Sequence, residues 1–128
     1  MSRPVDLESH LPLPPHLFQI LLTLLDRNLH GYAIQKDIAD RTEGEFTLGT
    51  STLYSALQRL VRDGFLEEAP GIPLEKGKGP PRNVFRITPL GRRLAREEGL
   101  RIRKLSQVVA ESGLFDALAP SGPGVEES

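Results

Sequence analysis

The stretch GTSTLYSALQRLVRDGFLE, residues 49–67, decides the fold. Its leucines recur at helical spacing, so the segment is predicted to form a helix that buries one face. The hydroxyl side chains that follow Gly49 can cap the free amides of the first turn, and Asp63-Gly64 is a typical helix end. The opposite face is short, polar and basic, and it presents Ser51, Thr52, Ser55, Gln58, Arg59 and Arg62.

Two further helices are predicted before this segment. Apolar side chains at positions 17, 20, 21, 24 and 25 share one helical face, which predicts a helix over about residues 15–28. Pro14-Pro15 can occupy its first turn. A second, shorter helix is predicted to follow His30-Gly31 and to stop at residues 42–44.

After Gly64 the apolar period changes from that of a helix to that of a strand. Residues 65–68 and 83–88 are predicted to form a two-stranded hairpin, joined by a long loop over residues 70–82. Thr88-Pro89 is then predicted to open another helix, with threonine as the cap and proline at the first helical position. This helix is expected to extend to about residue 112.

The predicted order of elements defines a fold class that is mainly α with a small β-hairpin. Three helices followed by a hairpin form a winged helix-turn-helix, and one more helix follows it. We expect the winged helix-turn-helix domain over residues 13–88 and the C-terminal helix over 89–118. Flexible tails are expected over residues 1–12 and 119–128.

Composition excludes several classes of protein. The 128 residues include no cysteine, which excludes disulfides, thiolate metal sites and cysteine catalysis. The length suits one domain. The sequence has no signal-peptide pattern and no apolar run of the roughly 18 residues that a membrane span needs. We therefore expect a cytoplasmic protein that makes no membrane contact.

Charge is distributed unevenly along the chain. The formal net charge is −1, yet residues 50–93 contain eight basic and four acidic residues, a local charge of +4. Phosphates are bound by positive charge on one face and not by the average over the molecule. This distribution favours double-stranded DNA as a partner, the alternative being that these are ordinary solvated charges.

No catalytic or metal-binding constellation is visible in the sequence. His10, His16 and His30 do not have the spacing of metal ligands, and the adjacent glutamate pairs do not form an acid–base couple. The loop over residues 71–82 departs from the Walker A spacing and precedes a strand, so it predicts no nucleotide site. We expect no enzyme activity, no cofactor and no bound metal.

The C-terminal helix has a larger apolar stripe than a small winged-helix domain can cover. The stripe either packs back on its own domain or forms an interface with a second copy of the chain. We favour a homodimer and interpret residues 89–118 as a dimerisation helix. The candidate interface residues are Leu94, Ile102, Leu105 and Val109.

Three blocks of the sequence resemble the PadR family of bacterial transcriptional regulators. They are HGYAI at residues 30–34, the stretch at 49–67, and RNVFRITPLGRRL at 82–94. The resemblance implies a winged-helix dimer that represses transcription by binding an operator, often released by a small-molecule effector at or near the dimer interface. Phe85 stands where many members have tyrosine, and the chain has no tryptophan with which to sandwich a flat drug.

These patterns together give the candidate DNA-contacting residues. The third helix would lie in the major groove and the wing on the sugar-phosphate backbone. Tyr32 would lie near a phosphate, unless it packs on the core and Gly31 relaxes the turn. The candidates are Tyr32, Gln35, Lys36, Thr50, Ser51, Thr52, Tyr54, Ser55, Gln58, Arg59, Lys76, Lys78 and Arg82. The alternative function is a winged-helix module that binds another protein through the same polar face.

Overall fold

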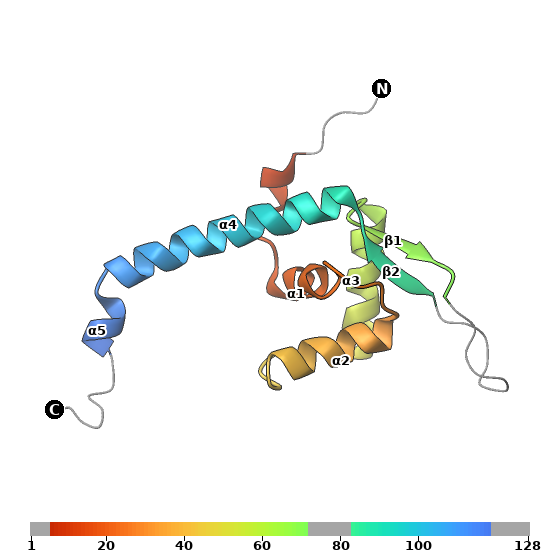
Figure 1. Ribbon diagram of the computed structural model, residues 1–128, viewed down its shortest axis with the longest axis horizontal. Coiled ribbons are helices and arrows are strands. Elements are labelled where there is room, and N and C mark those ends of the chain that lie inside the picture. The colour runs from red at the N-terminus through yellow and green to blue at the C-terminus, as the bar shows by residue number, and fades with distance from the viewer. Residues whose placement is uncertain (1–5, 72–82, 119–128) are drawn as a thin grey trace. The chain divides into compact units, whose positions relative to one another are not determined.

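The computed structural model describes residues 6–71 and 83–118 and divides the chain into two compact units, residues 1–98 and 99–128. The boundary between the units falls inside one helix. In chain order the elements, drawn in Figure 1, are η1 (Leu7–His10), α1 (Pro15–Thr23), α2 (Gly31–Arg41), α3 (Thr50–Arg62), β1 (Leu66–Ala69), β2 (Val84–Ile87), α4 (Pro89–Glu111) and α5 (Leu114–Leu118). The predicted fold class, mainly helical with one antiparallel hairpin, is confirmed.

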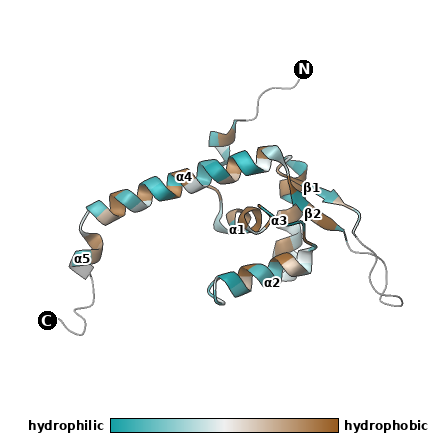
Figure 2. Cartoon of the chain, in the orientation of Figure 1, coloured by the Kyte–Doolittle hydropathy of each residue, from teal (hydrophilic) through white to brown (hydrophobic). Residues whose placement is uncertain are grey.

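The core of the first unit lies among α1, α2 and α3, with β1, β2 and the start of α4 closing it. In Figure 2 hydrophobic colour dominates α1, whereas α2 ends in hydrophilic colour. The side chains that are almost fully buried include Leu17, Ile20, Ile34, Leu53, Leu57 and Phe65. Since this set includes side chains from all three helices, the core fixes the position of α3 relative to α1 and α2.

The first helix is shorter than predicted, ending at Thr23 instead of about residue 28. Leu24 is its cap, and the chain then leaves the helical conformation. Leu29 pairs with Phe85 through two backbone hydrogen bonds, of 3.2 and 2.8 Å. The apolar periodicity did not predict this early end of the helix, because a residue in extended conformation beside the wing can also be apolar.

The third helix follows the predicted range, but its predicted hydroxyl cap is wrong. Gly49 occupies the cap position in an extended conformation, and within the described part of the chain no side chain caps this helix. Thr50, Ser51 and Thr52 lie one to three positions inside the helix and are exposed. The predicted stop at Gly64 is confirmed, since this residue has a φ of +85°.

The hairpin pairs Leu66 with Ile87 and Glu67 with Arg86 in antiparallel register. The inward side chain Phe85 is buried, while Arg86 and Glu67 are joined by an exposed ion pair of 2.7 Å. The loop between the strands, residues 72–82, lies outside the described residues. The predicted wing-tip contacts Lys76, Lys78 and Arg82 therefore lie outside them too.

The predicted threonine cap of α4 is confirmed. Thr88 Oγ1 accepts a hydrogen bond of 2.9 Å from the Gly91 amide and donates one of 2.7 Å to the Gly64 carbonyl. Pro89 is the first residue of the helix, which ends at Glu111. The short helix α5 that follows was not predicted.

The segment predicted to be an N-terminal tail contains structure between residues 7 and 13. The 3-10 helix η1 is capped by Asp6, whose carboxylate accepts a 3.1 Å hydrogen bond from the Glu8 amide. His10 packs edge-on against Phe65, with 5.0 Å between ring centroids, and Leu13 is buried. The prediction missed these contacts because they are tertiary and leave no periodic signal in the sequence.

Candidate nucleic-acid interface

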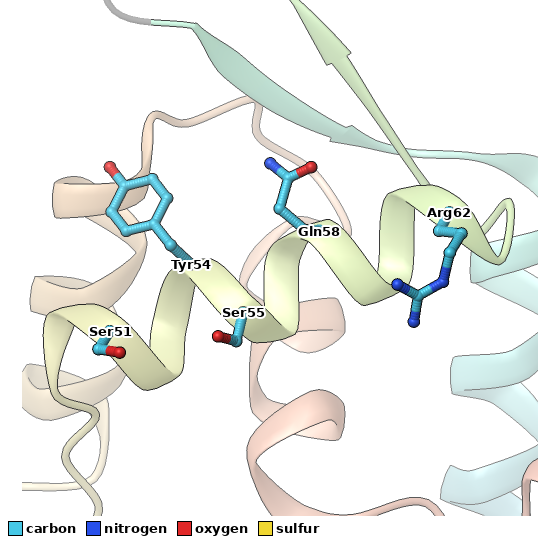
Figure 3. Close-up of a pocket in the computed structure, with 5 residues that line it drawn as sticks. All are labelled: Ser51, Tyr54, Ser55, Gln58 and Arg62. Atoms are coloured by element: carbon cyan, nitrogen blue, oxygen red, sulfur yellow. The ribbon is translucent and has the colours of Figure 1, made fainter.

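One polar stripe runs along the exposed face of α3. Residues spaced by three or four positions line a shallow groove there, shown in Figure 3, and they are Ser51, Tyr54, Ser55, Gln58 and Arg62. The opposite face holds Leu53, Leu57 and Leu60, which are almost completely buried. Because burial fixes one face in the core, the rotation of the helix is set and the polar stripe must point outward.

Four of the predicted DNA contacts line this groove, and the three others on α3 do not. Thr50, Thr52 and Arg59 are exposed on α3 but do not line the groove. Arg62 does line it, although the list of predicted contacts omits it. Helical spacing could have found Arg62, because it lies four residues after Gln58 on the same face.

Tyr54 is held against the start of α2. Its side chain is 42% exposed, and one side of the ring faces Gly31. A Cβ at Gly31 would lie 2.4 Å from Tyr54 Oη, so only glycine leaves room for the ring where it lies. Gly31 is a buried helical residue, so the interpretation that it relaxes the turn is wrong.

Tyr32 does not pack on the core, because its side chain is 59% exposed. It stacks on His30, with 6.5 Å between ring centroids and 14° between ring planes. His30 in turn caps α2, since its Nδ1 accepts a hydrogen bond of 3.3 Å from the Ala33 amide. The core-packing alternative for Tyr32 is therefore wrong, and its hydroxyl group is free of the core.

The other two candidates on α2 already have partners within the chain. Gln35 Nε2 donates a hydrogen bond of 2.6 Å to the Leu48 carbonyl, which ties α2 to the segment before α3. Lys36 lies 3.0 Å from Asp40, and this hydrogen bond raises the pKa of the lysine above its ordinary value. Gln35 thus positions α3, whereas Lys36 remains at the surface.

The positive charge of this half of the chain is only partly within the described residues. Residues 50–69 and 83–93 contain five basic and three acidic residues. Arg86 is paired with Glu67, and Arg62 approaches Asp63 at 3.9 Å. Arg59 and Arg62 are exposed on α3, so they supply the positive charge beside the groove.

The predicted dimer residues have different surroundings. Leu94 is 0% exposed and belongs to the core of the first unit, so its assignment to an interface with a second copy is wrong. The first turns of α4 complete the winged-helix core, which explains why the apolar stripe begins there. In the second unit, Ile102 and Leu105 are exposed and Val109 is half-buried.

Across residues 6–71 and 83–118, no group of three histidine, aspartate or glutamate residues comes together to hold a metal ion. In the same ranges no helix combines the length and the apolar character needed to cross a membrane.

The three helices, the paired wing strands and the outward polar face of α3 define a winged helix-turn-helix protein. Comparison with known families makes the assignment more specific, because the model of the transcriptional regulator PadR-like family matches residues 20–97. The chain belongs to this family. It is therefore a transcriptional regulator and not an enzyme, as we expected from the sequence.

The chain is also similar to individual known proteins. Uncharacterized protein X of Lysinibacillus sphaericus is 37% identical over 78 residues, which are 60% of this chain and 69% of that protein. A transcriptional regulator from Clostridium thermocellum is 26% identical, with a TM-score of 0.63 over 82% of this chain and 94% of the other. Bacillus subtilis PadR, solved in complex with operator DNA, has the same fold at 21% identity, with a TM-score of 0.59 over 67% of this chain and 46% of that one.

Proposed function

We propose that this regulator represses transcription by binding a palindromic operator as a homodimer, with α3 in the major groove of each half-site. The observation that carries the proposal is the polar stripe of α3, held outward by a fully buried opposite face. A protein of the same fold, Bacillus subtilis PadR, was solved with operator DNA. A cytoplasmic location follows from this role.

The side chains of the stripe have the chemistry needed to distinguish base pairs. Gln58 can pair with the N6 and N7 atoms of adenine, and an arginine can pair with O6 and N7 of guanine. Ser51 and Ser55 can donate to or accept from either kind of base edge. Each well-formed bidentate pair discriminates against the wrong base by about 1–3 kcal/mol.

Contacts to the sugar-phosphate backbone would position the helix without reading sequence. Tyr32 and Lys36 lie exposed on α2, which precedes α3 in the helix-turn-helix. The lysines and Arg82 of the wing loop supply further positive charge. These residues would set affinity and its dependence on salt.

The homodimer is supported by exposed apolar side chains in the second unit. Five of them are Ile102, Leu105, Val108, Leu114 and Phe115. Apolar surface of this kind marks an interaction site in a protein that is otherwise polar outside. A twofold dimer would place two α3 helices about 34 Å apart, one turn of DNA. The resemblance to the family further implies release of the operator by a small-molecule effector at or near the dimer interface, and we include this in the proposal.

Selection of bound fragments from the source genome tests this function. A shared palindrome should emerge, and binding to it should weaken steeply with salt while remaining tighter than binding to random duplex. Arg59→Ala should relax base preference, whereas Lys78→Ala should weaken all sequences alike and reduce the salt slope by about 1. Equal affinity for the palindrome and for random duplex at every salt concentration would refute the proposal. If the protein binds no DNA but binds a specific protein partner, the protein-binding module is favoured instead.

A further inference from the structure

We infer that Gly31 is a positioning residue for operator recognition: by lacking a side chain, it lets the Tyr54 ring lie in the groove of α3. This inference rests on the proposed function, because it names a residue that acts on DNA only through another residue. Gly31 itself is buried and is not a candidate DNA contact.

The contact leaves no room for a Cβ at position 31 while the Tyr54 ring stays where it lies. A Cβ added to Gly31 would lie 2.4 Å from Tyr54 Oη, 2.6 Å from Cζ and 3.1 Å from Cε1. Ordinary contacts of a Cβ begin at 3.4 Å. An alanine at this position therefore requires either Tyr54 or the backbone of α2 to move.

The backbone of α2 is held in place from several directions. Ile34 and Ile38 are completely buried in the core, so the helix cannot shift outward without opening it. The Gln35 side chain donates to the Leu48 carbonyl and fixes α2 against the segment before α3. The Ala33 amide donates to the cap residue, His30.

The Tyr54 ring is the part that can give way. It is at the far end of a side chain that is nearly half exposed, and Figure 3 shows it extending away from the axis of α3. A methyl group at Gly31 should thus displace the ring by roughly 1 Å, which is more than a recognition site tolerates. The three atoms nearest to the added Cβ all belong to Tyr54, so we expect the other groove residues to remain where they are.

Four full-length proteins test the inference: the unchanged chain, Gly31→Ala, Tyr54→Ala and the double variant. Their affinities are measured by fluorescence anisotropy on the selected palindrome and on random duplex at one salt concentration. Each single variant should lose at least about fivefold on the palindrome. The double variant should bind no more weakly than Tyr54→Ala, because the ring that the methyl displaces is absent.

Gly99→Ala is the matched control, since among the described residues its added Cβ would meet nothing within 4 Å apart from its chain neighbours and the nearby backbone of its own helix. It should bind as the unchanged chain does. The inference is overturned if Gly31→Ala binds normally, if its loss multiplies with that of Tyr54→Ala, or if Tyr54→Ala itself binds normally.

Tyrosine resonances give a second measurement that needs no DNA. The chain has only two tyrosines, so labelling with 13C-tyrosine yields two ring spin systems, which Tyr54→Phe assigns. Gly31→Ala should shift the Tyr54 signals, and unchanged Tyr54 signals would overturn the inference. A shift in a protein that selects no palindrome would leave the contact in place but refute both the proposed function and the operator role of Gly31.

Folding is controlled within the same set of variants. If Gly31→Ala alone fails to fold, the double variant should restore folding, because removal of the Tyr54 ring removes the clash. A double variant that still fails, while Tyr54→Ala folds, would mean that the methyl clashes with the backbone, and it too would overturn the inference.

Discussion

At the scale of single residues, two glycines of α4 have opposite surroundings. A Cβ at Gly91 would lie 2.1 Å from the carbonyl oxygen of Phe65 and 2.8 Å from Ile87 Cγ1. Backbone cannot move away as a side chain can, so α4 would have to lift from the start of the wing. Gly99 has open space around it within the described part of the chain.

Alanine at these two positions should therefore have effects of opposite sign on the free energy of unfolding. Gly91→Ala should lower it by about 1–3 kcal/mol or more, as overpacking does in a closed core. Gly99→Ala should raise it by up to about 1 kcal/mol, because alanine favours the helical conformation. Urea unfolding of both variants measures the difference. Equal effects would contradict the close contact at Gly91.

Asp37 links two arginines from different segments. Its carboxylate accepts a 2.7 Å hydrogen bond from Arg27 and another from Arg41. The hydrogen bond from Arg27 is the main reason that the pKa of Asp37 lies below its ordinary value. A carboxylate whose pKa is lowered by folding stabilises the fold above its unfolded pKa, and this stabilisation is lost as the pH falls through the folded pKa.

Asp37→Asn should therefore be less stable than the unchanged chain at pH 7. The difference should begin to shrink as the pH falls below about 4, the ordinary range of an aspartate, and disappear once Asp37 is protonated in the folded protein. Urea unfolding at several pH values measures both chains. A difference in stability that stays constant from neutral pH into strong acid would show that the ion pairs do not stabilise the fold.

At the scale of elements, the geometry of α3 favours Arg62 over Arg59 as the arginine that contacts bases. Arg62 lines the groove with Ser55 and Gln58, whereas Arg59 is exposed beside it. Arg62→Ala should lose about 1–3 kcal/mol of binding to the selected palindrome and less to random duplex. Arg59→Ala should lose less on the palindrome than Arg62→Ala. Competition binding of both variants measures this order, and the reverse order would place α3 in the groove with a different rotation.

The elements themselves could largely be predicted from the sequence, because periodicity reports which face is buried. The leucines of α3 and the alternation of β2 each gave the correct kind of element. The end of α1 could not be predicted from local sequence. The chain leaves the helical conformation before Leu29, which pairs with Phe85 from a distant part of the chain. The prediction of the α3 cap was wrong because three neighbouring hydroxyl side chains are typical of a helix cap, whereas Gly49 occupies the cap position.

The candidate site was predictable in its composition but not in its geometry. Helical spacing gave most of the residues that line the groove. The contact between Gly31 and Tyr54 joins two helices, so no spacing within one segment could indicate it. The role of Leu94 could not be predicted either. The apolar stripe of α4 is continuous in the sequence, but its first residues are buried in the core and its later residues are exposed.

At the scale of the whole molecule, the proposed homodimer would bring two copies of α3 to one operator through the exposed apolar side chains. A single α3 offers few base contacts, and two linked copies gain affinity because the second half-site binds as an intramolecular event. Leu105 is 52% exposed in the second unit, where such a side chain is a liability unless a partner covers it.

Leu105→Lys should therefore convert the proposed dimer into a monomer, because a charge buried in an apolar interface has no partner. Affinity for the palindrome should fall by roughly a hundredfold, the scale of a lost second site, while the fold of the first unit is preserved. Gln107→Lys is the matched control, since position 107 is exposed on another face of α4. Sedimentation and anisotropy measure assembly and affinity. A Leu105→Lys chain that still sediments as a dimer would mean that the interface lies elsewhere, and a monomeric chain that still binds the palindrome tightly would show that pairing is not required.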